Sequence, residues 1–227
     1  MKILSIDTSS KICSIALLED DRLIEEISEN NGYTHSETLM PLIDKLLSKQ
    51  NLTLKNIDLI ICDKGPGSFT GIRIGVATAK GFSDSLNISS IGISSLEALA
   101  YNVKNTGLIC SLIDAKNQNT YWSLFENNDD NYTLKEQFSI DNINNILENL
   151  PSKYSNITFV GDGSLMYKNL IQEKMPESKF CENNELSAYN LALAGFKHFQ
   201  NNKIDELLPL YLRKSQAERL LENKNIS

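Results

Sequence analysis

Residues 65–75 read Gly-Pro-Gly-Ser-Phe-Thr-Gly-Ile-Arg-Ile-Gly, and they follow an apolar run, Ile57–Cys62, that is typical of a strand buried on both faces. The glycine-rich turn is predicted to open a helix that continues to about Leu86. A further strand is predicted at Ile88–Ile93 and a helix at Ser94–Asn102. Strand–helix–strand order predicts a right-handed crossover between parallel strands, and therefore an α/β fold.

The glycines of this turn match neither of the common phosphate-binding loops. The Walker pattern G-x-x-x-x-G-K-[ST] is absent, and the spacing G-x-G-x-x-x-G differs from the dinucleotide fingerprint. Backbone N–H groups at the start of the helix would still be aimed at an anion. We favour a steric role instead. Gly71, Gly75 and Ala79 are four residues apart and form a strip of small residues that lets another helix approach closely.

The N-terminal stretch predicts a strand and a hairpin before this unit. Residues 2–7 are typical of a buried strand, and residues 12–18 and 23–28 follow at hairpin spacing. The segment Ile6–Ser10, with Asp7 and three hydroxyl residues, is either a cradle for phosphate or a metal-bound water, or a turn in which Asp7 accepts from the backbone. From these residues alone we favour the turn.

A helix over about 35–48 is predicted from Thr34-His35-Ser36-Glu37, which has the form of a capping box. Pro41 lies inside this helix, and we expect a kink or a stepped start there. Apolar residues recur on one face at helical spacing, namely Leu39, Leu42, Ile43, Leu46 and Leu47.

A second αβ run begins near residue 105 and weakly repeats the first. Two domains are therefore predicted, 1–104 and 105–227. The elements expected in the second are strands at 108–114, 121–126, 132–140 and 157–160, and helices at 141–150, from Ser164, and at 187–201, followed by an extended tail at 208–213.

No residue pattern predicts catalysis or a metal centre. His35 and His198 lie far apart without a ligand pattern around them, and we expect both at the surface or at helix ends. Ser68 lies off the centre of a nucleophile elbow, and no histidine is placed as its base. The four cysteines have no C-x-x-C spacing, and Cys13 and Cys62, which lie in apolar strand-like runs, are predicted to be buried thiols in a reducing compartment.

Composition argues against direct binding to nucleic acid or membrane. The 227 residues carry a formal net charge of −7, whereas affinity for RNA depends on neutralising phosphates. We find neither a signal peptide nor an apolar stretch near the roughly 20 residues of a membrane span. A cytoplasmic protein that reaches RNA only through a partner is expected.

Several segments together resemble the TsaB family, and the resemblance covers the whole chain. The most specific is residues 65–75. Others support it by order and spacing, namely Ile6–Ser9, His35–Glu37 with Pro41–Ile43, Ala79–Gly81, Gly92–Glu97, Asp114–Lys116 with Tyr121, Gly161–Gly163 and Tyr211–Arg213. Lys116 stands where the family resemblance leads us to expect arginine.

The resemblance implies an actin-like fold of the sugar kinase and Hsp70 type, with two similar lobes. It also implies a catalytically inactive relative of TsaD, which performs the threonylcarbamoyl transfer. TsaD-like proteins carry a metal-binding H-x-E-G-H pattern, and Ser95 and Leu99 stand where its two histidines would be, so that only Glu97 remains. We expect no catalytic residue, no metal and no cofactor. Whether a nucleotide binds is open, because Thr8, Ser9 and Ser10 fill the turn where actin-like ATPases have glycine.

The implied role is that of a non-catalytic scaffold in threonylcarbamoyladenosine modification of tRNA. TsaD is the expected partner, docked on helices 35–48 and 69–84, and TsaE joins through the TsaB–TsaD complex. A homodimer is left open, and so is the alternative of an actin-like metallopeptidase or small-molecule kinase. The docking surface is predicted to comprise Leu39, Leu42, Ile43 and Leu46 with Phe69, Gly71, Ile72, Gly75, Val76 and Ala79.

Overall fold

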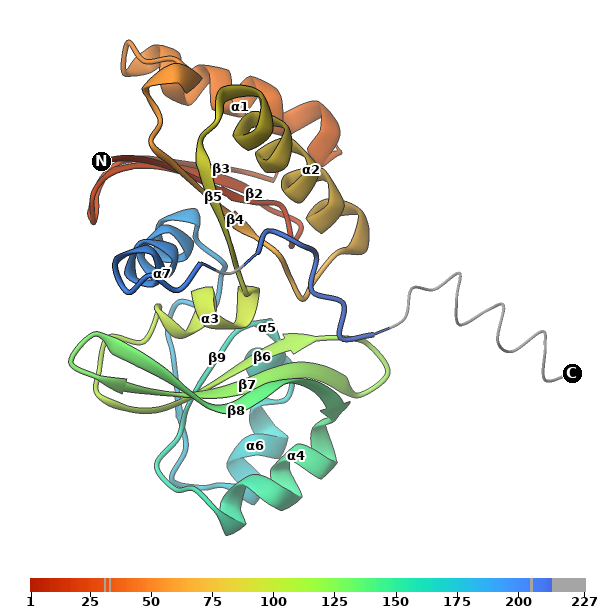
Figure 1. The fold of residues 1–227 in the computed structure, drawn as a ribbon. Helices are drawn as coiled ribbons and strands as arrows, with labels where there is room; N and C mark the ends of the chain where they lie inside the picture. Colours follow the sequence, from red (N-terminus) through yellow and green to blue (C-terminus); the bar gives the residue numbers. More distant parts are fainter. Residues whose placement is uncertain (31, 33, 205, 214–227) are drawn as a thin grey trace, which may run out of the picture.

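The computed structural model describes residues 1–30, 32, 34–204 and 206–213, which form two lobes, each built on a five-stranded sheet (Figure 1). The first sheet has the order β3-β2-β1-β4-β5. Its strands are β1 (Lys2–Asp7), β2 (Cys13–Glu19), β3 (Arg22–Glu29), β4 (Leu59–Asp63) and β5 (Ser89–Ile93). β1, β4 and β5 are parallel and β2 and β3 are antiparallel to their neighbours, as the crossover and the hairpin predicted.

The second sheet repeats the first in topology. Its order is β10-β9-β6-β7-β8, with β6 in the central position that β1 takes in the first lobe. Its strands are β6 (Gly107–Asp114), β7 (Asn119–Asn128), β8 (Asn131–Asn142), β9 (Thr158–Val160) and β10 (Lys179–Phe180). The weak repeat in the sequence therefore reflects a repeated fold. β10 was not predicted, because two residues are too few for an alternating pattern.

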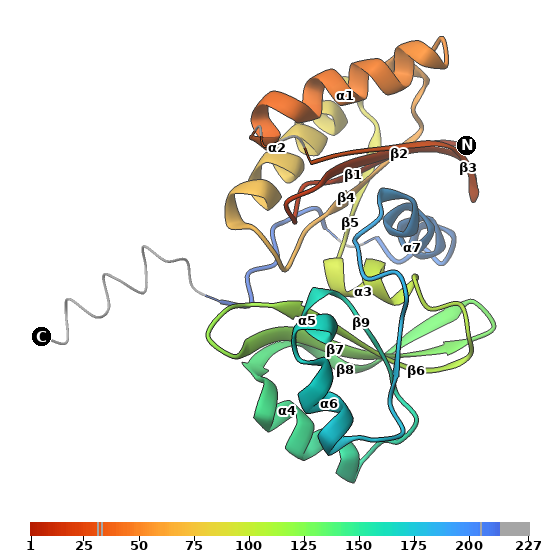
Figure 2. The same ribbon diagram turned by 180° about the vertical axis from the view of Figure 1, so that it is seen from behind.

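Helices cover both faces of the first sheet (Figures 1 and 2). One face packs against α1 (His35–Lys49) and α2 (Phe69–Leu86), and the other against α7 (Ala188–Gln200). Side chains of a strand point alternately to the two faces, so Leu4 and Ile6 of β1 lie under α1 and α2, whereas Ile3 lies under α7.

The second sheet is covered by α3 on the side that faces the first lobe and by further helices on its far side (Figure 2). α3 (Ser95–Ala100) is shorter than the helix predicted at Ser94–Asn102. The helix predicted from Ser164 is divided into α5 (Asp162–Met166) and α6 (Lys168–Lys174). The remaining helical segments are the 3-10 helices Leu54–Asn56 and Leu150–Ser152, and α4 (Ile143–Asn149).

α1 begins at the predicted capping box. The Glu37 carboxylate accepts from the Thr34 backbone N–H at 3.1 Å, and the Thr34 side chain completes the box. The helix continues through Pro41 without interruption, and the Pro41 side chain is exposed. None of the helices among the described residues is both long and apolar enough to cross a membrane.

The division at residue 104 describes the two sheets but not the end of the chain. α7 lies beyond that boundary and yet packs on β1, β2, β4 and β5 of the first lobe. Residues 206–213, which we call the strap, then run from the first lobe to the second (Figure 1). The Leu210 N–H donates to Lys64 O at 2.7 Å, and Arg213 Nη1 donates to Ala115 O at 2.6 Å. The tail predicted at 208–213 forms the end of the strap, and the residues after Arg213 lie outside those described.

Candidate functional site

Most of the side chains predicted to form the docking surface are buried inside the first lobe, and whether α1 and α2 dock a partner stays a prediction. The apolar stripe of α1 is at most 2% exposed and packs on the sheet, as do Ile72, Val76 and Ala79 of α2; the α1 residues are Leu39, Leu42, Ile43 and Leu46. Phe69 is half-buried and stacks on Tyr211 of the strap, with the ring centroids 4.9 Å apart. A lobe of this size needs both stripes for its own core.

The strip of small residues on α2 is occupied by the turn between β1 and β2. The Thr8 hydroxyl donates to Gly71 O at 2.8 Å. A Cβ added at Gly71 would lie 1.9 Å from Thr8 O, and one at Gly75 would lie 2.4 Å from Thr8 Oγ1. The steric reading of these glycines is therefore correct, but the segment that approaches them belongs to this chain and is not a foreign helix.

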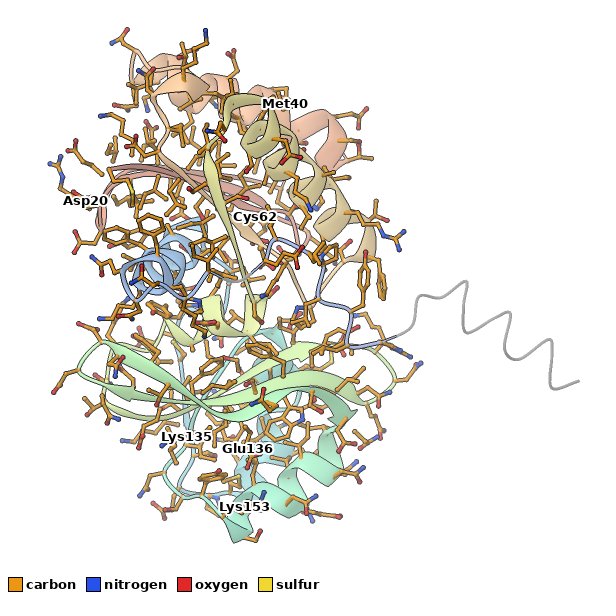
Figure 3. All side chains as sticks on the ribbon, in the orientation of Figure 1. Asp20, Met40, Cys62, Lys135, Glu136 and Lys153 are labelled. Atoms are coloured by element: carbon orange, nitrogen blue, oxygen red, sulfur yellow. The ribbon has the colours of Figure 1, made fainter. Side chains whose placement is uncertain are left out.

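Other residues of α1 and α2 lie away from the sheet, and we call them the outer face: Met40, Pro41, Ala77 and Gly81 are exposed, and Ile74 at their edge is half-buried. Met40, labelled in Figure 3, is 48% exposed. Ala77 and Gly81 are exposed one helical turn apart, and a Cβ added at Gly81 would meet nothing within 4 Å. Small exposed residues at this spacing let a second helix come close to α2.

A buried acid pair lies at the carboxyl ends of β1 and β4. Asp7 and Asp63 are each 1% exposed, and Ser9 Oγ lies between them, 2.7 Å from Asp7 Oδ1 and 3.1 Å from Asp63 Oδ2. Asp63 Oδ1 also accepts from the Gly65 N–H at 2.6 Å and from the Ser95 hydroxyl at 2.7 Å. Ligands of open α/β sheets bind at such carboxyl edges, so this is where the fold would hold a nucleotide or cation.

Burial dominates the electrostatics of this acid pair. Loss of hydration raises the pKa of Asp63 well above its usual range, and the neighbouring charge of Asp7 raises it further. Burial also raises the pKa of Asp7, against which the hydrogen bonds from Ser9 act. Burial likewise raises the pKa of the nearby Cys62 thiol.

The turn after β1 is the Asx-type turn that the sequence favoured. Asp7 Oδ1 accepts from the Ser9 N–H at 2.8 Å. The sequence did not indicate that Asp63 and Ser95 would join this turn, because neither lies near it in the chain. Ser95, which stands at a position of the TsaD histidine pattern, serves here as a hydrogen-bond donor to a carboxylate.

Chain segments close over this edge of the first sheet. The Ser68 N–H donates to Ser9 O at 2.7 Å, which ties the glycine-rich turn to the β1–β2 turn. A Cβ added at Gly92 would lie 3.0 Å from Glu206 O, and one at Gly65 would lie 3.1 Å from Leu210 O. The strap therefore runs against the backbone at both glycines.

Glu97 is paired with His198, which lies buried in the last turn of α7, so the helix-end prediction is confirmed for this histidine. Nε2 of His198 donates to Oε1 of Glu97 at 2.7 Å, and both residues are less than 9% exposed. The two are 101 positions apart, so helical spacing gave no signal of the contact. The pair joins α3 to α7 in the layer between the lobes. His35, at the first position of α1, has Nε2 2.8 Å from Ser10 O, and there the helix-end prediction is confirmed.

Lys116 lies in the turn between β6 and β7. Its Nζ is 2.6 Å from Asp114 Oδ2, and this contact raises the pKa of the lysine. Lys116, Asn117 and Gln118 all have positive φ. The preceding residue, Ala115, accepts the hydrogen bond from Arg213 of the strap. Within the described ranges, no three His, Cys, Asp or Glu side chains are grouped to hold a metal ion.

Comparison with known proteins supplies the family. A curated relative from Bacillus subtilis, named tRNA threonylcarbamoyladenosine biosynthesis protein TsaB, is 34% identical over 96% of this chain and 96% of its own length. A protein of the same name from Haemophilus influenzae is 29% identical over 94% of each chain. The chain belongs to the TsaB family. The sequence model of the family described as TsaD, tRNA N6-adenosine threonylcarbamoyltransferase, matches residues 26–220.

Solved structures agree with this placement in the TsaB family. YeaZ from Pseudomonas aeruginosa has a TM-score of 0.76 and 26% identity, covering 93% of this chain and 99% of its own. A ROK family protein from Streptococcus pneumoniae, at 10% identity, has a TM-score of 0.56 over 89% of this chain and all of its own. The latter shows the fold alone, and the actin-like fold with two similar lobes is confirmed.

Replacing Glu97 by leucine is expected to destabilise the chain by about 1–3 kcal/mol, because it removes the acceptor of a buried hydrogen bond to His198. Glu97→Gln keeps an acceptor oxygen and should lose less. Urea unfolding measures both, with Glu173→Leu, an exposed position on α6, as the matched control. Equal midpoints for Glu97→Leu and Glu173→Leu would contradict a stabilising role for the pair.

Proposed function

We propose that this TsaB-family chain acts in threonylcarbamoyladenosine modification of tRNA as a docking subunit that does not transfer the group itself. The names of its curated relatives support the pathway. The proposed partner is a TsaD protein, because the TsaD family model matches most of the chain and indicates a shared fold. Two proteins of one fold can pair through equivalent helices.

The observation that best supports a non-catalytic role is that segments of this chain fill the edge of the first sheet where ligands of this fold would bind. The β1–β2 turn occupies the small-residue strip of α2, and the Asp7 and Asp63 carboxylates are bonded to serines of this chain. The strap lies against Gly65 and Gly92. These polar side chains are thus hydrogen-bonded within the chain at the place where a substrate or cofactor of this fold would bind.

The outer face of α1 and α2 is the proposed docking surface for TsaD. This revises the residues expected from sequence, whose side chains are in the core, but keeps the two helices. A helix-on-helix contact fits the exposed Ala77 and Gly81 of α2, and the exposed, flexible apolar side chain of Met40 on α1 can adapt to a partner. We propose that TsaE joins through the TsaB–TsaD complex, in the cytoplasm, and that the same face serves for any homodimer.

An indirect relation to tRNA follows from charge. With a formal net charge of −7, the lone chain would repel the phosphate backbone, so the partner would supply the basic surface. The alternative of an actin-like metallopeptidase or kinase differs in one respect that is easily measured, since it requires turnover by the lone chain.

Co-expression with the TsaD protein of the same organism, followed by size-exclusion chromatography, tests the proposal. We expect one peak that contains both proteins and no peptide or phosphoryl-transfer activity of the isolated chain. Separate elution of the two proteins at micromolar concentration, or turnover by the isolated chain, would refute the docking role.

A further inference from the structure

The acid pair at the edge of the first sheet lacks one hydrogen-bond donor that two ionised carboxylates would need. Ser9 Oγ carries a single hydrogen and lies within hydrogen-bond distance of both Asp7 Oδ1 and Asp63 Oδ2. The 2.7 Å contact with Asp7 is the shorter one and takes that hydrogen. If both acids were ionised, the 3.1 Å contact between Ser9 Oγ and Asp63 Oδ2 would join two acceptors with no hydrogen between them.

The structure assigns a proton to this place: we propose that Asp63 is held as the neutral acid, with Oδ2–H donating to Ser9 Oγ while the Ser9 hydroxyl donates to Asp7. The proton thereby takes the position between two carboxylates where a cation would otherwise sit. Asp63 is the better carrier because its Oδ2 has an acceptor in Ser9, and a proton on Asp63 also stabilises the neighbouring Asp7 carboxylate. Oδ1 of Asp63 stays free to accept from Gly65 and Ser95.

The other ionisable side chains near the acid pair are consistent with a proton on Asp63. His35 on α1 is the ionisable base that acts on Asp7. Cys13 on β2 and Cys62 on β4 also face it, and burial raises the pKa of both thiols, so they carry no charge that would replace the proton. The Lys64 side chain lies beside Gly92. Two adjacent buried carboxylates would repel each other, and one shared proton removes that repulsion.

The consequence is a pH-dependence of known sign. The folded chain keeps a proton that the unfolded Asp63 releases above a pKa of about 4. Because the folded pKa is the higher one, this contribution to stability is present at acid pH and is lost as the pH rises towards the folded pKa. Within that window the folding equilibrium constant falls about tenfold per pH unit from this group alone.

Asp63→Asn isolates the effect, since an asparagine amide donates to Ser9 as the neutral acid does and cannot ionise. Urea unfolding of the full chain between about pH 5 and pH 7 should show wild type losing about tenfold more in its folding constant per pH unit than Asp63→Asn. His35 is present in both proteins and cancels in the difference. Asp84→Asn, an exposed position on α2, is the control and should parallel wild type.

Two further readouts keep the assignment falsifiable if Asp63→Asn folds poorly. The infrared spectrum of the wild-type chain at neutral pH should contain the carbonyl band of a protonated carboxyl group. Addition of Mn²⁺ should leave the wild-type unfolding midpoint unchanged. Three results would each overturn the proposal. The first is a pH-dependence of stability that is the same in wild type and Asp63→Asn, and the second is the absence of that infrared band. The third is a saturable stabilisation of wild type by Mn²⁺ that Asp63→Asn lacks.

Discussion

The Gly81→Arg variant is expected to be more stable than the natural chain and to lose its binding to TsaD. Gly81 lies inside α2, where glycine costs about 1 kcal/mol relative to good helix formers such as alanine and arginine. A Cβ added at this position meets no atom of the chain within 4 Å, and the position is exposed, so the rest of the arginine side chain can extend into solvent. A loss of binding therefore cannot be attributed to misfolding.

The expected loss follows from the proposed docking surface, because the arginine would stand where a partner helix would approach. Blocking the centre of a helix contact costs on the order of 2 kcal/mol or more, which is roughly a thirtyfold weaker Kd. Calorimetry with purified TsaD measures it. Ala77→Arg, one turn away, should act alike, and Gln172→Arg on α6 of the second lobe should bind as the natural chain does. Wild-type affinity for both outer-face variants would place the docking surface elsewhere.

The same substitution at two glycines of α2 is expected to have opposite effects on stability. Gly71→Ala would put a Cβ 1.9 Å from Thr8 O, a backbone atom that cannot turn aside, and it would disturb the 2.8 Å bond from the Thr8 hydroxyl to Gly71 O. Overpacking of this kind costs about 1–3 kcal/mol or more. Gly81→Ala should instead gain about 1 kcal/mol.

Urea unfolding of the two alanine variants separates the inner from the outer side of α2. Both remove one glycine from the same helix, so the effect on the unfolded chain is shared. A midpoint that falls for Gly71→Ala and rises for Gly81→Ala is the expected result. If both midpoints moved in the same direction, Thr8 would not be packed against Gly71 as the structure has it.

Local patterns predicted the elements of the fold well, because each depends on residues close in sequence. The Thr34–Glu37 capping box and the glycine-rich turn at 65–71 mark the starts of α1 and α2. The buried runs of β1 and β4 identify the central strands. Even the repeat of the two lobes left a trace in the sequence.

What the sequence could not indicate is which segment covers which surface. The spacing of Gly71 and Gly75 predicts that something approaches closely, but Thr8, which fills the space, is more than 60 positions away. The same holds for the contact of His198 with Glu97 and for the packing of Tyr211 on Phe69. An apolar stripe has the same pattern whether it meets its own sheet or a partner, and here the core takes both stripes.

Reconstitution of tRNA modification with purified components tests the docking role most directly. Threonylcarbamoyl-adenylate and tRNA would be incubated with TsaD and TsaE in the presence of the natural chain, of Gly81→Arg, or of neither, and threonylcarbamoyladenosine would be quantified. The account predicts modification only with the natural chain and TsaD together, and a large loss with Gly81→Arg. Modification by the chain without TsaD, or full modification without the chain, would contradict it.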